Sequence, residues 1–278
     1  MKKFDSELIF EIASKFKKTD GILSKTKKME HGIKIISTQI LNSDASKKLG
    51  RDVGKYVSFV FDEILFFDAK AKDALSNNLS KEIKTLLKIH KINPKKVLVV
   101  GLGNDRYACD GLGKSTTGRV LVTKPYLEKK LFSKKQMDEV YTFLPGVYGT
   151  TGLESAETIK CVCNMLKPDL VVVIDSLVAT KPMSLAKSIQ LSNTKLSPGG
   201  GVGNNRLEVS EKLLGTKVFA IGFPTVANLS DEFGSMKDLI VTPKDIEKKC
   251  TEVSKIIATA INITFCRLSK DEISELTN

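Results

Sequence analysis

The alternation of short apolar runs with segments of helical periodicity constrains the fold of this chain more than any other feature of its sequence. Two of the runs, Val97 to Val100 and Leu170 to Ile174, contain no polar residue, which is typical of strands that are buried on both faces of a sheet. The first run stops at Gly101 and the second at Asp175. Strands that alternate with helices through short loops predict an α/β fold with a mostly parallel sheet covered on both faces.

The same pattern predicts the other elements. We expect further strands at residues 32–36, 56–61, 140–143, 188–191 and 218–221, and helices at 70–91, 154–166, 208–214 and 243–265. For the last helix we expect Thr242 as the N-cap and Pro243 in the first position. The first thirty residues are rich in lysine, with an amphipathic start at Leu8, and we expect them to be peripheral. A chain of 278 residues without an internal repeat or an evident linker is expected to form one domain.

The chain carries a formal net charge of +12, from 44 lysines and arginines against 32 aspartates and glutamates. A basic chain can bind nucleic acid, but 39 of these cations are lysine and only five are arginine, the residue that reads bases and grips phosphates with two hydrogen bonds. Tryptophan is absent and the lysines are spread along the chain, so there is no stacking platform for single strands. We therefore predict a solvated lysine surface and no direct nucleic-acid partner.

The cysteines and histidines also exclude classes of protein. Five cysteines without regular spacing, and no apolar segment after Met1, predict a protein of the reducing cytoplasm. No run approaches the roughly 20 apolar residues of a membrane-spanning helix, so we expect no membrane partner. The two histidines, His31 and His90, have no cysteine or carboxylate at ligand spacing. We therefore predict no metal and no cofactor.

Two loops invite a nucleotide-binding interpretation but lack its spacing. After Gly101 and Gly103, a dinucleotide fingerprint needs a glycine at position 106, where Arg106 stands. The Gly-Lys-Ser tripeptide that begins at Gly113 would need, as a phosphate loop, a glycine where Ala108 stands. A phosphate- or nucleotide-binding enzyme that uses this region is kept as one hypothesis, and its test is a thermal shift with ATP or NAD.

Two carboxylates are more informative, because Asp175 ends an apolar run and Asp110 lies in the loop that follows another. Ligands of open parallel sheets bind beyond the carboxyl ends of the strands, where these two acids can converge. Burial and a neighbouring carboxylate raise the pKa of such an acid, so one member of the pair can activate water while the other donates a proton. Two alternatives stay open: Asp175 caps a helix or pairs with a lysine, or Cys109 acts as a nucleophile beside Asp110.

A set of short motifs keeps one order from about residue 18 to residue 265. It includes Gly32-Ile33-Lys34-Ile35, Val99-Val100-Gly101-Leu102-Gly103-Asn104, Asp110-Gly111-Leu112-Gly113, Leu144-Pro145-Gly146-Val147, Ile174-Asp175-Ser176-Leu177, Pro198-Gly199, Gly201-Val202-Gly203-Asn204 with Arg206, and Pro224-Thr225-Val226. This ordered set resembles the germination proteases, spore endopeptidases that degrade small acid-soluble spore proteins.

The resemblance implies an atypical aspartic peptidase with Asp110 and Asp175 as its catalytic pair and with no metal or cofactor. It also implies a three-layer α/β/α sandwich similar to that of hydrogenase maturation endopeptidases. The residues that it places in the substrate site are Asn104, Gly146, Gly152, Gly201 and Asn204. The family members are cytoplasmic enzymes of the spore core and usually form homo-oligomers, which we expect here as well.

The resemblance further implies a zymogen that removes its own N-terminal segment. Residues 1–20 would be the propeptide and residues 21–278 a single peptidase domain. Lys18-Thr19-Asp20 corresponds to the Arg-Thr-Asp tripeptide of the family, so the scissile bond would join Asp20 to Gly21. The sequence Glu11-Ile12-Ala13-Ser14 also resembles the substrate signal of glutamate, a hydrophobic residue and alanine.

Three departures from the family pattern support an alternative hypothesis. Ala108-Cys109 stands where Thr-Pro is usual, Thr180 stands where an arginine is common, and the connection at residues 228–239 is short. The alternative is a divergent binding or regulatory protein on the peptidase fold that binds substrate without turnover.

Overall fold

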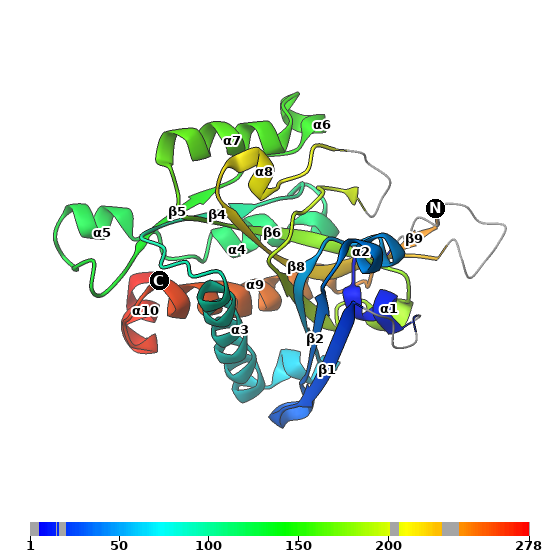
Figure 1. Cartoon of the computed structure of the whole chain (residues 1–278). Helices are drawn as coiled ribbons and strands as arrows, with labels where there is room; N and C mark the ends of the chain where they lie inside the picture. Colours follow the sequence, from blue (N-terminus) through cyan, green and yellow to red (C-terminus); the bar gives the residue numbers. More distant parts are fainter. Residues whose placement is uncertain (1–5, 15, 17–20, 201–205, 230–238, 278) are drawn as a thin grey trace.

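The computed structural model describes residues 6–14, 16, 21–200, 206–229 and 239–277 of the chain. The strands are β1 (Ile22–Lys28), β2 (Lys34–Ile40), β3 (Gly54–Val60), β4 (Lys96–Gly101), β5 (Glu139–Phe143), β6 (Leu170–Ala179), β7 (Ser188–Ser192), β8 (Lys217–Asn228) and β9 (Ile240–Val241). The α-helices are α1 (Ile9–Ser14), α2 (Ser43–Leu49), α3 (Ala69–Ile89), α4 (Leu112–Thr117), α5 (Lys124–Glu128), α6 (Tyr148–Thr151), α7 (Ser155–Leu166), α8 (Glu211–Leu214), α9 (Ile246–Phe265) and α10 (Lys270–Thr277). In this part of the chain, nine strands form one sheet with the order β1-β2-β3-β7-β8-β6-β4-β5, and β9 pairs with β8 (Figure 1).

The parallel half of the sheet holds the purely apolar runs. β5, β4, β6 and β8 are parallel neighbours. Successive side chains of a strand point to opposite faces, so Val97 and Val99 pack with α3 and α9, while Leu98 and Val100 pack with α7. Helices α3 and α9 lie on one side of the sheet and α7 and α8 on the other (Figure 1). The predicted α/β class with helices on both faces of the sheet is confirmed.

The other half of the sheet extends the parallel core with antiparallel strands. β7 runs antiparallel to β8, and β3, β2 and β1 continue in the same manner to the edge. β1 is exposed along most of its length and carries Lys25, Lys27 and Lys28. Lysines on an edge strand oppose its pairing with other chains. No apolar run marks this strand in the sequence, because it buries almost nothing.

The prediction that the first thirty residues are peripheral is wrong for residues 6–14. Ile9 and Ile12 are fully buried against α2, β2 and β3. Leu8 is buried in a separate cluster with residues of β6 and β8. The amphipathic face of α1 therefore forms part of the interior. Full burial of an aliphatic side chain of this size contributes about 1.5–3 kcal/mol, so this segment is held firmly.

The start of the last long helix also differs from the prediction. α9 begins at Ile246 with Asp245 at the N-cap position, so both positions lie three residues later than predicted. The Thr242 hydroxyl instead donates to the carbonyl oxygen of Thr225 in β8, at 2.8 Å. Thr242 therefore anchors the chain to the sheet and is not available as a cap. Among the described helices, none has both the length and the apolar composition that a membrane crossing needs.

Candidate active site

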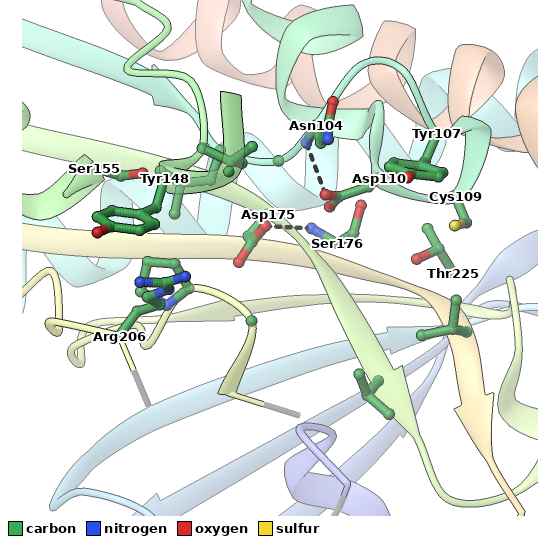
Figure 2. A pocket seen from close by; sticks show the side chains of 18 of the residues that line it. Asn104, Tyr107, Cys109, Asp110, Tyr148, Ser155, Asp175, Ser176, Arg206 and Thr225 are labelled. Atoms are coloured by element: carbon green, nitrogen blue, oxygen red, sulfur yellow. Dashed lines mark hydrogen bonds between the residues drawn. The ribbon is translucent and has the colours of Figure 1, made fainter. Parts of the chain in front are cut away.

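A cavity of about 650 Å³ opens where β4 ends and β6 continues, and both Asp110 and Asp175 line it. Figure 2 shows the two carboxyl groups from different elements facing the same space. Asp175 comes from β6 and Asp110 from the 3₁₀ turn (Ala108–Asp110) that precedes α4. The structure therefore brings together the two acids that the sequence singled out.

The sequence predicted Asp175 at the end of its strand, but Asp175 lies within β6. The apolar run stops at Ile174, but β6 continues to Ala179 beside β8. β4 stops earlier, since its last residue, Gly101, is in register with Ile174. Asp175 is thus the first residue of β6 that has no β4 residue beside it, because β4 ends one position earlier. As a strand residue it caps no helix, and within the described residues it makes no ion pair with a lysine.

The loop after β4 fills the space beyond the end of this strand and holds Asp110. The backbone N–H of Asn104 donates to Asp110 Oδ2 at 2.7 Å. Gly103 has a φ of +105°, and a Cβ there would lie 2.2 Å from the carbonyl oxygen of Asp110. A Cβ on Gly113 would lie 2.1 Å from the carbonyl oxygen of Leu102. These glycines therefore allow the loop to pack on itself and on α4, which does not support the phosphate-loop hypothesis.

Burial and charge give the two carboxyls different proton affinities. Desolvation raises the pKa of Asp175 well above its ordinary value, and the charges of Asp110 and Glu7 raise it further. The hydrogen bond from the N–H of Ser176 lowers this pKa but does not cancel the rise. Desolvation also raises the pKa of Asp110, and the N–H of Asn104 opposes it. Asp175 is the more strongly shifted group, so of the two carboxyls it keeps its proton to the higher pH, and Asp110 ionises first. This asymmetry provides one base and one acid in a single site.

The other nucleophile and ligand candidates are placed less favourably. Burial and the charge of Asp110 raise the pKa of the Cys109 thiol, which disfavours the reactive thiolate. His31 contacts Asp68 at 3.1 Å, and His90 contacts Asn193. Among the residues that the structure describes, no three histidine, cysteine, aspartate or glutamate side chains gather as a metal site would require.

Arg206 and its partners form a cationic wall of the cavity that sequence reasoning did not assign. Its guanidinium lies 4.3 Å from the ring centroid of Tyr148, and Nη1 is 3.0 Å from Glu154 Oε1. Figure 2 shows Arg206 and Tyr148 on the Asp175 side of the cavity. One carboxylate uses only part of the five-donor guanidinium, so the group can also bind an anionic ligand. Arg206 belongs to a quoted motif, but only the fold places it beside the acids.

The N-terminal segment forms another wall of the cavity. The N–H of Glu7 donates to the carbonyl oxygen of Val178 at 2.8 Å, and Glu7 Oε2 accepts from the N–H of Val178 at 2.8 Å. Gln190 donates to the carbonyl oxygen of Glu7 at 2.9 Å and accepts from the N–H of Ile9 at 2.8 Å. The segment is thus bound to β6 and β7, with the Glu7 side chain in the cavity. No sequence signal indicated this contact, because it joins residues that are far apart in the chain.

The predicted substrate-binding residues have mixed positions. Asn104 lines the cavity. Gly146 and Gly152, with φ of +72° and +71°, lie at the two ends of α6 and outside the cavity lining. They shape the turn that brings Tyr148 into the cavity. Gly201 and Asn204 lie outside the described residues.

The predicted processing site is described on one side only. Asp20 lies outside the described residues, whereas Gly21 precedes β1 with a φ of +89°. The carbonyl oxygen of Gly21 accepts from the N–H of Leu41 at 2.8 Å. Glu11, in the second candidate signal, is buried in α1 and accepts from the hydroxyl of Ser6 and the N–H of Thr180.

Comparison with known proteins gives one consistent family. A model of the family described as germination protease matches residues 6–231. The germination protease of Clostridium perfringens is 33% identical over 288 residues, which cover 88% of each chain. That of Caldanaerobacter subterraneus is 32% identical over 89% of each chain, and that of Priestia megaterium is 33% identical over 75% of this chain and 56% of its own. Among solved structures, the [NiFe] hydrogenase maturation protease HycI from Thermococcus kodakarensis matches with a TM-score of 0.35 and 18% identity, over 61% of this chain and 94% of that chain.

Proposed function

Because the chain belongs to the germination protease family, and is therefore a peptidase, we propose that it is the endopeptidase that degrades small acid-soluble spore proteins during germination. We propose that Asp110 and Asp175 are its catalytic pair. The observation that carries this proposal is the pair itself: two carboxyls in one cavity with unequal, raised pKa values. We further propose that it acts in the spore core as a homo-oligomer.

In the proposed mechanism the pair activates water without a covalent intermediate. The Asp110 carboxylate accepts a proton from water as the water oxygen attacks the carbonyl carbon of the peptide bond. The carbonyl becomes a tetrahedral centre with negative charge on its oxygen. The proton held by Asp175 passes to the departing amide nitrogen, and the carbon–nitrogen bond breaks. Asp110 then carries the proton and Asp175 is the carboxylate, so one proton exchange restores the starting state.

The cationic wall supports a substrate with an acidic side chain. The Arg206 guanidinium is fixed by Tyr148 and Glu154 on the same side of the cavity as Asp175. An arginine that is held in this manner binds a carboxylate with little loss of side-chain freedom. We therefore assign Arg206 to the glutamate of the cleavage signal.

The bound N-terminal segment supports synthesis as a zymogen. Glu7 of this segment forms part of the cavity wall, and its charge raises the pKa of Asp175. We propose that removal of residues 1–20 uncovers this wall, with cleavage between Asp20 and Gly21. The buried position of Glu11 and its helical backbone make the Glu11-Ile12-Ala13-Ser14 signal a poorer substrate, since a peptide must be extended and accessible to be cut.

The function is tested by incubating the chain with a small acid-soluble spore protein and measuring fragment masses. We expect cleavage by the parent that resists both a chelator and a thiol blocker, and no cleavage by folded Asp110→Asn or Asp175→Asn. Asp105→Asn is the matched control, because Asp105 is exposed in the same loop and is paired with Lys114. Parent-like cleavage by either active-site variant would refute the pair. Binding without turnover by the parent would favour the regulatory protein.

A further inference from the structure

A β-bulge lies in β8 directly beside the carboxylate pair. Leu177 of β6 is in register with Pro224, but the next residue, Val178, is in register with Val226. Thr225 is therefore an extra residue of β8 that has no partner across the strand pair. Bulges next to active sites re-aim a side chain, and Thr225 lines the cavity that contains Asp110.

The backbone on both sides of the bulge is fixed by hydrogen bonds. The carbonyl oxygen of Thr225 accepts from the hydroxyl of Thr242 at 2.8 Å, and that of Pro224 accepts from the N–H of Ala186 at 2.9 Å. The bulge is therefore a built feature, and the direction of the Thr225 side chain is set by its neighbours. Rigid support of this kind is what a catalytic hydrogen-bond donor requires.

The side chain of Thr225 is buried without a hydrogen-bond partner. Thr225 is 1% exposed, and its Oγ1 has no partner in the part of the chain that the structure describes. The hydroxyl of Ser176, the residue after Asp175, is in the same state and also lines the cavity. Figure 2 shows Ser176 between Asp175 and Thr225 in that view. A buried hydroxyl that is left unpaired destabilises the fold. Because both Thr225 and Ser176 line the cavity, a polar group of a bound substrate can supply the partner that these hydroxyls lack.

We propose that the Thr225 hydroxyl, assisted by that of Ser176, donates a hydrogen bond to the carbonyl oxygen of the scissile peptide and stabilises its negative charge in the tetrahedral intermediate. The inference rests on the proposed peptidase mechanism at this site. As water adds, the carbonyl π electrons move onto the oxygen, and Thr225 keeps its own proton throughout. The proton of Asp175 is then free to go to the amide nitrogen, so the two hydroxyls and the acid have separate tasks. A donor that is aimed at developing charge accelerates the chemical step more than it strengthens ground-state binding.

The test compares Thr225→Val, which keeps the shape, with Thr225→Ser, which keeps the hydroxyl. We expect valine to lower kcat by about 10²-fold, with KM nearly unchanged, and serine to keep most of the parent kcat. We expect the Tm of Thr225→Val to equal or exceed that of the parent, because an unpaired buried hydroxyl is removed. A purely structural threonine would lower Tm together with kcat.

Ser58→Ala is the matched control, because the Ser58 hydroxyl is also buried and without a partner among the described residues, but lies outside the cavity lining. We expect this variant to keep the parent kcat. Should valine prevent folding, Thr225→Ala makes the same comparison with serine. A parent-like kcat in the valine or alanine variant overturns the inference, as does an equal loss in the serine variant. If Asp110→Asn and Asp175→Asn are inactive while Thr225→Val is fully active, this inference fails and the proposed function stands.

Discussion

The burial of Asp175 links its proposed catalytic role to the stability of the fold. Its pKa is raised in the folded chain by burial and by the charges of Asp110 and Glu7, whereas in the unfolded chain it is ordinary. The folded state therefore binds the proton more tightly than the unfolded state does. The resulting stabilisation is complete below the ordinary pKa range and is lost as the pH rises through the raised pKa. At neutral pH the site costs the fold free energy.

We expect Asp175→Asn to increase the free energy of unfolding at about pH 7 by at least ~1 kcal/mol. The amide is neutral at every pH, so it removes the cost of holding a proton on a buried carboxyl that ionises freely in the unfolded chain. It can still accept from the N–H of Ser176, which donates to Asp175 Oδ1 at 2.9 Å. The gain should shrink towards zero below about pH 4. Urea unfolding of parent and variant at both pH values measures this. A variant that is less stable than the parent at neutral pH would contradict the assignment of a raised pKa.

Arg206 is the residue that we expect to set the preference for an acidic substrate. For peptides that differ only in glutamate or glutamine at the cleavage signal, we expect the parent to favour glutamate by about tenfold in kcat/KM. Arg206→Ala should remove that preference because the cationic partner is lost.

The control for Arg206 is Arg106→Ala, which makes the same change of charge. Arg106 is exposed on the loop after β4 and lies outside the cavity lining. The Arg106→Ala variant should keep the preference for glutamate. An equal effect of the two substitutions would indicate long-range attraction by net charge and not a contact in the cavity.

At the scale of elements, the loop after β4 matters because it determines where Asp110 lies. We expect Gly103→Ala to destabilise the chain by about 1–3 kcal/mol, since the residue has a φ of +105° and its Cβ would meet the backbone of Asp110. It should also lower kcat, because the loop can relieve the contact only by moving Asp110. Thermal unfolding and kcat are the measurements.

Gly149→Ala serves as the control for this loop, because a Cβ there meets nothing within 4 Å and Gly149 also lines the cavity. We expect it to leave stability almost unchanged. If Gly103→Ala behaves in the same way, the close approach of this glycine to Asp110 has no energetic importance.

The elements also show how far the sequence could predict the fold and the site. The apolar runs located the buried strands β4 and β6, because a strand covered on both faces has no polar residue to interrupt it. They missed β1, whose residues are exposed, and they ended β6 at Asp175, because a buried acid looks like the end of a run. The positions of strand ends, and the motifs of the family, predicted Asp110 and Asp175 as site residues. Thr225 belongs to a quoted motif, but only the bulge places it in the cavity. Glu7 reaches the cavity through a tertiary contact, which leaves no local pattern in the sequence.

At the scale of the whole molecule, the proposed processing requires the catalytic site to act on a segment that is part of its own wall. We expect storage in mild acid to shorten the parent by residues 1–20, because the proposed carboxylate pair would cut the chain that carries its own bound N-terminal segment. Asp175→Asn should keep its full mass. Intact-mass measurement over time follows both chains.

Adding a trace of active parent to Asp175→Asn separates two routes of processing. Shortening of the variant under these conditions would show that one molecule cuts another, and a rate that depends on concentration would agree with this. Loss of residues 1–20 from Asp175→Asn alone would contradict processing by the proposed pair.

The attachment of Glu7 and Ile9 to β6 and β7 has a consequence for the proposed zymogen. A segment that is covalently joined to its binding site has a fixed effective concentration, commonly millimolar for a short tether, whatever the amount of protein present. A substrate that needs the same N–H and C=O groups of Val178 competes against this constant local ligand. In the proposed zymogen, dilution therefore does not free the site, whereas a cut in the tether makes the segment a separate peptide whose release does depend on dilution.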